Sequence, residues 1–238
     1  MEESRQCFEL LQAGDVQGLR ELLGEHRACA DARDSNGVSL LMQSLYRGHR
    51  DLAELIASKK EALDIFEASS LGRLDRLQEI LLENRAGSLS SDGSRSIDAP
   101  SKDGFTALHF ACFLYQPEAV RMLIESGASV DAVAANRTQV MPLHSAATSR
   151  NLEAARLLLE RGAPVNARQQ AGWVPIHAAA QNGDRPMVEL LLKHNADSKL
   201  TNDDGKTPGM VAREKGHQEL AALLDGTQSA EGRRLKPA

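Results

Sequence analysis

The chain has 238 residues, of which 42% are hydrophobic, so it is long enough to bury a sizeable core and is not a disordered chain. Aromatic residues make up only 3% while Ala and Leu dominate, which favours close-packed helices over a sheet. The formal net charge of -5 provides no positive field that would draw the protein onto nucleic acid or an anionic membrane, so neither is expected as a partner.

The first residues, MEESRQCFELLQAG, carry acids where a signal peptide has basic residues, and no later stretch has the length of a membrane span. Cys7, Cys29 and Cys112 are odd in number and lack a CxxC spacing, which is typical of reduced thiols. The two common phosphate-binding patterns, GxxxxGK[ST] and GxGxxG, are absent from the sequence. We therefore expect a cytoplasmic protein that holds no metal or other cofactor.

One unit repeats along the chain, a short helix followed by a tight turn and an apolar helix. Apolar or Ala residues stand five, eight and nine positions after the turn in nearly every unit, for example Leu77, Ile80 and Leu81. These offsets share one helix face, so each unit must stack on its neighbours to bury that face. The pattern predicts an all-α solenoid of about seven stacked helix pairs. The predicted turn residues are Gly14, Gly48, Gly72, Tyr115, Arg150, Gly183 and Gly216.

The spacing of the turns is regular except at two places. Successive intervals are 34, 24, 43, 35, 33 and 33 residues. A loop is therefore missing between the second and third turns, and an extra one is present between the third and fourth turns. The Ser, Gly and Asp content of residues 85–102 is typical of a solvated loop. We predict a single repeat domain over residues 1–225 with this inserted loop, followed by a disordered tail over 226–238.

Local signals for helix ends agree with this period. Thr106 and Thr207 stand where a helix N-cap belongs, while the two intervening units have Met or Val there. Gly127, Gly162 and Asn195 fall just after the apolar helices, where a left-handed C-terminal cap requires Gly or Asn.

The tetrads TALH, MPLH and VPIH, followed by helices that end in LIESGASVDA, LLLERGAPVNA and LLLKHNADSKL, resemble the ankyrin repeat. The resemblance is strong over residues 103–225 and weaker but in phase over 5–85. Among ankyrin proteins, the chain is most similar to the stand-alone ones common in prokaryotes.

The resemblance implies a short β-hairpin or turn finger on each helix pair, and a concave groove between the fingers and the shorter helices where partners usually bind. It also implies a structural role for His109, His144 and His177, each bonding its short helix to the adjoining hairpin backbone. Stacked repeats lie about 10 Å apart, too far for these imidazoles to share one metal ion with bonds of about 2 Å.

Candidate binding residues are large apolar side chains at positions that the fold is expected to leave exposed. Phe105, Val140 and Trp173 each lie just before a tetrad and predict an apolar stripe, because exposed apolar stripes with aromatic residues often mark binding sites. The alternative is that the rings pack between hairpins and that the inserted loop covers Phe113. The predicted protein-binding residues are Phe105, Phe113, Leu114, Val140, Gln170, Trp173, Gln181, Asn182 and Asp203.

These observations together predict a protein–protein interaction scaffold. We expect a monomer that is not an enzyme and that binds a protein partner through the concave groove and the hairpin tips. Two alternatives stay open: a regulatory or inhibitory subunit of an enzyme, and an architectural spacer without a groove ligand.

Overall fold

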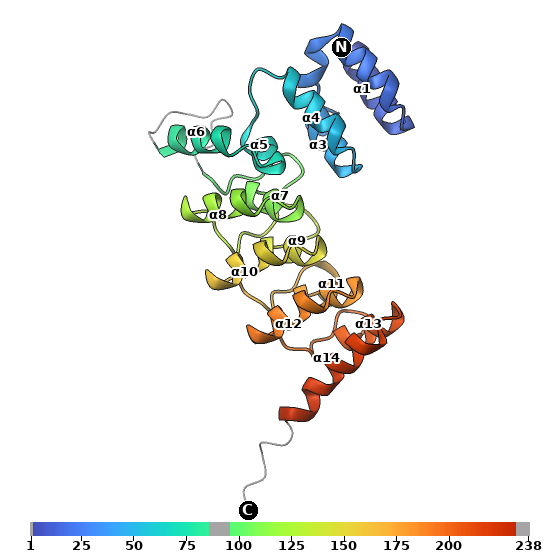
Figure 1. Ribbon diagram of the computed structural model, residues 1–238, viewed down its shortest axis with the longest axis vertical. Coiled ribbons are helices and arrows are strands. Elements are labelled where there is room, and N and C mark those ends of the chain that lie inside the picture. The colour runs from blue at the N-terminus through green and yellow to red at the C-terminus, as the bar shows by residue number, and fades with distance from the viewer. Residues whose placement is uncertain (1, 86–95, 232–238) are drawn as a thin grey trace, which may run out of the picture.

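The computed structural model describes residues 2–85 and 96–231, which form a column of paired helices (Figure 1). Within these ranges the helices follow one another as seven antiparallel pairs, joined by loops and two short 3-10 helices. The all-α repeat fold predicted from the sequence is therefore confirmed. The bounds are α1 Glu2–Ala13, α2 Val16–Glu25, η1 Arg27–Asp31, α3 Leu40–Tyr46, α4 Arg50–Lys59, α5 Ile65–Leu71, α6 Leu74–Arg85, α7 Ala107–Phe113, α8 Pro117–Glu125, α9 Pro142–Thr148, α10 Leu152–Glu160, η2 Gln170–Gly172, α11 Pro175–Asn182, α12 Arg185–Lys193, α13 Pro208–Glu214 and α14 Gln218–Glu231.

The two helices of every pair are joined by a residue with positive φ, at the seven positions that the spacing indicates. Five of these residues are Gly, which adopts this backbone conformation without steric cost. Tyr115 and Arg150 adopt it at φ values of 64° and 61°, at a cost of about 1 kcal/mol each. Hydrogen bonds offset this cost, because the Tyr115 hydroxyl donates to the Arg150 carbonyl and the Arg150 guanidinium donates to the Asn182 carbonyl.

The fingers are the tight loops at 101–105, 134–140, 169–173 and 202–206, which lead into α7, α9, α11 and α13. Neighbouring fingers are joined by backbone hydrogen bonds of 2.7 to 3.0 Å, for instance from the Ala135 N–H to the Gly104 carbonyl. They lack the regular strands of a β-hairpin, since the single bridge within residues 2–85 and 96–231 joins Arg33 to Ser39 in an earlier loop. Each finger is too short for a ladder, so the expected fingers take their turn form.

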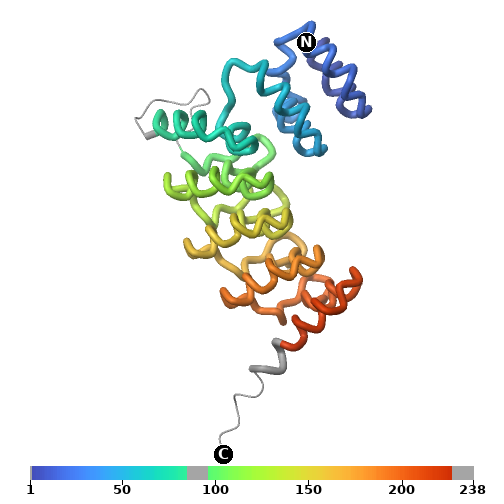
Figure 2. The backbone as a smooth tube through the Cα atoms, in the orientation of Figure 1, coloured from blue at the N-terminus to red at the C-terminus, as the bar shows by residue number. Residues whose placement is uncertain are grey.

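Buried apolar side chains form two clusters instead of one continuous core. The larger cluster runs from Ala68 in α5 to Leu224 in α14. The smaller one is built by α1 to α4 and also takes in Leu71 and Phe110. Their boundary falls near residues 60–64, the short connector between α4 and α5, and Figure 2 shows the first two pairs set to one side of the later column.

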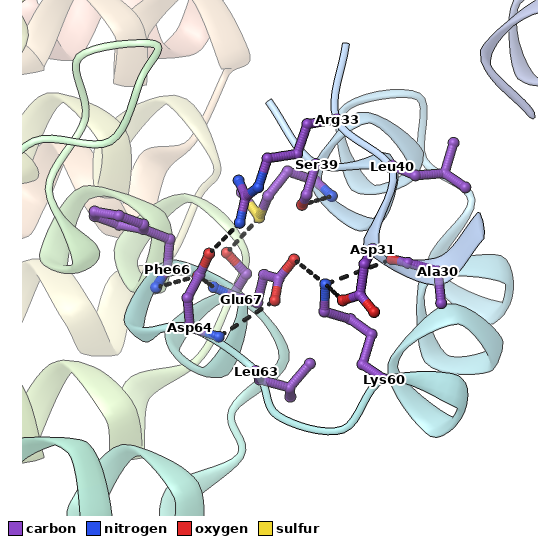
Figure 3. A network of polar contacts seen from close by, with 12 residues as sticks. Ala30, Asp31, Arg33, Ser39, Leu40, Lys60, Leu63, Asp64, Phe66 and Glu67 are labelled. Atoms are coloured by element: carbon purple, nitrogen blue, oxygen red, sulfur yellow. Dashed lines mark hydrogen bonds and ion pairs between the residues drawn. The ribbon is translucent and has the colours of Figure 1, made fainter. Parts of the chain in front are cut away.

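A buried ion pair lies at this connector (Figure 3). The Lys60 side chain is 4% exposed, and its Nζ lies 2.8 Å from Asp31 Oδ1 and 3.4 Å from Glu67 Oε1. The backbone N–H of Asp64 donates to Glu67 Oε2, and Asp64 Oδ1 caps α5 by accepting from two backbone N–H groups. Burial raises the pKa of Glu67, as does the nearby Asp64, while Lys60 opposes them. The connector, where the sequence lacks a loop, thus places polar contacts between the two clusters.

The end of the array differs from the sequence prediction. Helix α14 continues to Glu231, so residues 226–231 of the tail expected to be disordered are helical. No Pro interrupts this stretch, so the backbone can continue as a helix although its apolar period has ended. Residues 232–238 of the predicted tail, and 86–95 of the predicted inserted loop, lie outside the described residues. Residues 96–100, which follow position 95, lead into the finger before α7.

Candidate protein-binding groove

A groove with a volume of about 730 Å³ lies between the fingers and the short helices α7, α9 and α11. Seven of the nine predicted binding residues line it: Phe105, Phe113, Val140, Gln170, Trp173, Gln181 and Asn182. Two predicted residues do not. Leu114 is half-buried and packs against the N-terminal cluster, and Asp203 is an exposed residue of the next finger whose N–H donates to the Ala171 carbonyl.

Aromatic side chains are concentrated in this groove. The whole chain has eight of them, and five line the groove: Tyr46, Phe105, Phe110, Phe113 and Trp173. The sequence prediction missed Tyr46 and Phe110. A signal for Tyr46 was present, because it stands two residues before the turn at Gly48, as Phe113 stands two residues before the turn at Tyr115. Phe110 reaches the groove from a position with only 3% exposure.

The expected exposure of the finger stripe was wrong, because Phe105, Val140 and Trp173 are half-buried. The Phe105 ring lies against His109 of its own unit, with 5.9 Å between ring centroids, and the Trp173 ring lies in the same way against His177 at 5.5 Å. A ring just before the tetrad folds over the imidazole instead of projecting into solvent. The more open apolar surface belongs to the ends of the short helices, where Phe113 is 44% exposed and Tyr46 is 39% exposed.

The three tetrad histidines connect neighbouring units, which confirms their predicted structural role. In each ring Nδ1 accepts the backbone N–H of the first tetrad residue, at 3.1 to 3.3 Å. Nε2 therefore carries the proton and donates it over 3.0 Å to a carbonyl of the following loop, at Val140 for His109, Ala167 for His144 and Lys206 for His177. The Nδ1 bond also satisfies a backbone N–H at the starts of α9 and α11, where Met141 and Val174 offer no side-chain cap.

Burial keeps these imidazoles neutral. It lowers the pKa of His144 to about 4, against the partly opposing effect of its bond to the Ala167 carbonyl. The pKa values of His109 and His177 are lowered for the same reason. Since both ring nitrogens are engaged and the rings are uncharged, His109 and His144 contribute polar but neutral surface to the groove.

Asp103 is the one formally charged side chain among the described residues that line the groove. It lies in the first finger, at the end of the groove nearest α3. Its two carboxylate oxygens accept hydrogen bonds from the hydroxyls of Tyr46 and Ser101. At the opposite end the lining is polar and neutral, with Gln170 and Gln181 exposed, while the Asn182 side chain donates to the Thr148 carbonyl at 3.0 Å.

Stacked helix pairs, linked fingers and tetrad histidines define a helical solenoid built from one repeated unit. The family model described as Ankyrin repeats (3 copies) matches residues 65–169 and 163–230, which together make up most of the chain. The chain therefore belongs to the ankyrin-repeat family, whose members are generally protein–protein interaction modules. A comparison with curated proteins finds no match. The first two helix pairs precede the matched residues but have the same turn geometry.

No helix within residues 2–85 and 96–231 combines the length and the apolar character needed to cross a membrane.

Proposed function

We propose that this chain is an interaction module that binds a segment of a protein partner in the groove between its fingers and its short helices. The observation that carries the proposal is the placing of five of eight aromatic side chains along that one groove. Aromatic residues are enriched among the side chains that dominate binding energy, and concave apolar surfaces are where ligands bind most often. Phe113 and Tyr46 supply exposed apolar area, and Phe105, Val140 and Trp173 supply a firmly packed wall.

The proposed role is binding without catalysis. An acid–base pair needs two titratable groups within reach of one reacting atom. His109 and His144 use both ring nitrogens in structural hydrogen bonds, and the Asp103 carboxylate is held by two hydroxyls. A regulatory subunit of an enzyme would bind by the same surface, whereas a spacer without a ligand would have no use for the exposed Phe113 ring.

We further propose that the protein acts in the cytoplasm as a monomeric scaffold. All three cysteines are free and buried, which suits a reducing compartment. Sedimentation of the purified chain tests the monomer directly, since a dimer at micromolar concentration would contradict it.

The test of groove binding is affinity capture with the wild type and with a Phe105→Ala, Trp173→Ala double variant that circular dichroism shows to be folded. The proposal expects a partner that the double variant loses. For that partner, Trp173→Ala alone should weaken binding by about 2 kcal/mol, the range of a binding hot spot. Equal losses of melting temperature and of affinity would instead assign Trp173 to the scaffold, and unchanged capture would refute the proposal.

A further inference from the structure

The charge at the Tyr46 end of the groove has no counter-charge. Asp103 has hydrogen-bond partners for both carboxylate oxygens, but these are the neutral hydroxyls of Tyr46 and Ser101. Among the residues that the structure describes, no cationic side chain forms an ion pair with it. The two hydroxyls fix the direction of the carboxylate without neutralising it. A ligand cation arriving there would gain a pre-oriented partner, which limits the entropy lost on binding.

Aromatic rings line the groove on the side of this carboxylate. The Tyr46 ring lies 6.3 Å from that of Phe110, and the Phe105 ring packs edge-on against Phe110 at 5.7 Å between centroids. All three line the groove together with Asp103. An aromatic face attracts a cation within about 6 Å of its centroid, and the attraction grows where water is excluded. The rings and the carboxylate therefore favour the same kind of ligand group.

The rest of the lining adds no charge that would compete. The chain contains 28 Lys and Arg residues, yet none of them lines this groove among the described residues. Val140 and Trp173 give the wall its apolar surface, and the polar groups beside them are neutral amides, hydroxyls and imidazoles. An acidic peptide would find no positive partner there, and its carboxylates would lose hydration without compensation.

We propose that the groove selects a partner segment in which one Lys or Arg side chain, bound at Asp103 beside the Tyr46 and Phe105 rings, is followed by apolar side chains that lie toward Trp173. This inference rests on the proposed function, because it names the chemistry of the segment that the same groove would bind. Asp103 then sets the position of the segment along the groove, and the apolar wall supplies most of the binding energy.

The test is selection of short random peptides, displayed on phage, against the full chain. Selected peptides should share one basic position at a fixed distance from a pair of aromatic or aliphatic residues. Selection against Asp103→Asn should lose the basic position and keep the apolar one, because Asn still accepts a hydrogen bond from the Tyr46 hydroxyl. The matched control is Asp204→Asn, which changes the corresponding Asp of the last finger outside the groove.

The outcomes separate the two proposals. Apolar peptides without a basic position, or a basic position that persists with Asp103→Asn, would overturn the inference and leave groove binding intact. Peptides that bind the Phe105→Ala, Trp173→Ala double variant as well as the wild type would overturn the proposed function and the inference with it, as would a selection that enriches no sequence.

A second measurement does not depend on the folding of any variant. A selected peptide is titrated into the wild-type chain, whose single tryptophan, Trp173, supplies the fluorescence signal. The same peptide with its basic residue replaced by Met is titrated in parallel. We expect the Met peptide to bind about tenfold more weakly, as the loss of a partly desolvated cation contact implies. The advantage of the basic peptide should shrink as salt is added. Equal affinities for the two peptides would overturn the inference.

Discussion

Mild acid should destabilise the central units through His144. This side chain is 2% exposed, accepts the Met141 N–H at Nδ1 and donates from Nε2 to the Ala167 carbonyl. Protonation would give the ring a second hydrogen, at Nδ1, which would break the bond from Met141 and put a charge in a dry site. The pKa of His144 is about 4 in the folded protein and 6.5 in the unfolded chain. Between these values the unfolded chain binds a proton at this side chain and the folded protein does not. The stability contributed by neutral His144 is complete above pH 6.5 and is lost as pH falls toward 4.

The size of this loss follows from the two pKa values. The difference between about 4 and 6.5 corresponds to about 3 kcal/mol when both states have titrated, and about 2 kcal/mol is lost by pH 5. The pKa values of His109 and His177 are lowered as well, so their effects have the same sign. Acid unfolding should therefore begin within the ankyrin units that these rings connect.

The assay is urea unfolding followed by circular dichroism at pH 7 and pH 5, for the wild type and for His144→Gln. The Gln amide can still donate toward the Ala167 carbonyl but does not titrate. The wild type should lose about 2 kcal/mol more than the variant between the two pH values, because every other titrating group is shared. Equal losses would refute the reasoning, since they would mean that His144 accepts a proton in the folded state near its ordinary pKa.

Two further predictions concern the connector and the turns. Lys60→Met should lower the free energy of unfolding at pH 7 by about 3 kcal/mol, because it leaves the Glu67 carboxylate buried without its cation; adding Glu67→Gln should recover part of that loss in the same urea assay. The deficit of Lys60→Met should shrink as pH falls, because a protonated Glu67 is neutral and no longer needs the cation. Since the pKa of Glu67 is raised in the folded protein, protonation stabilises the fold fully below the unfolded pKa, and this stabilisation is lost as pH rises through the folded pKa. A deficit independent of pH would contradict this account. Gly183→Ala should cost more than the roughly 1 kcal/mol expected of Gly216→Ala, since both have positive φ but only the Cβ at Gly183 would meet the His217 ring, at 2.6 Å; equal thermal shifts for the two variants would contradict it.

The sequence predicted those parts of the fold that depend on local backbone requirements. Gly48 and Gly183 mark turns because a left-handed residue must join two helices that fold back on each other, and the period of the unit places Tyr115 at an equivalent turn without a Gly. The tetrad His positions were predictable for a similar reason, since His109 and its equivalents occupy one place in every unit. Seven groove residues followed from the same register.

Features that depend on contacts between units were not predictable in this way. Phe105 and Trp173 precede their tetrads, but their half-burial depends on how each ring folds over a histidine. Phe110 directly follows a tetrad histidine, as the groove-lining Ser145 and Ala178 do, but its burial depends on the rings of Tyr46 and Phe66 that pack against it from other units. Helical continuation to Glu231 runs through polar residues, which an apolar period does not report.

The central claim is that a partner lies in the groove, and site-specific photocrosslinking tests it most directly. The photoreactive residue benzoylphenylalanine would replace Phe113, 44% exposed in the groove, or Leu82, 56% exposed on α6 and not among the groove-lining residues. In cells that express the chain, the account predicts that Phe113 crosslinks one protein segment, that Leu82 does not, and that Trp173→Ala abolishes the product. The same product from both positions, or from Leu82 alone, would contradict it.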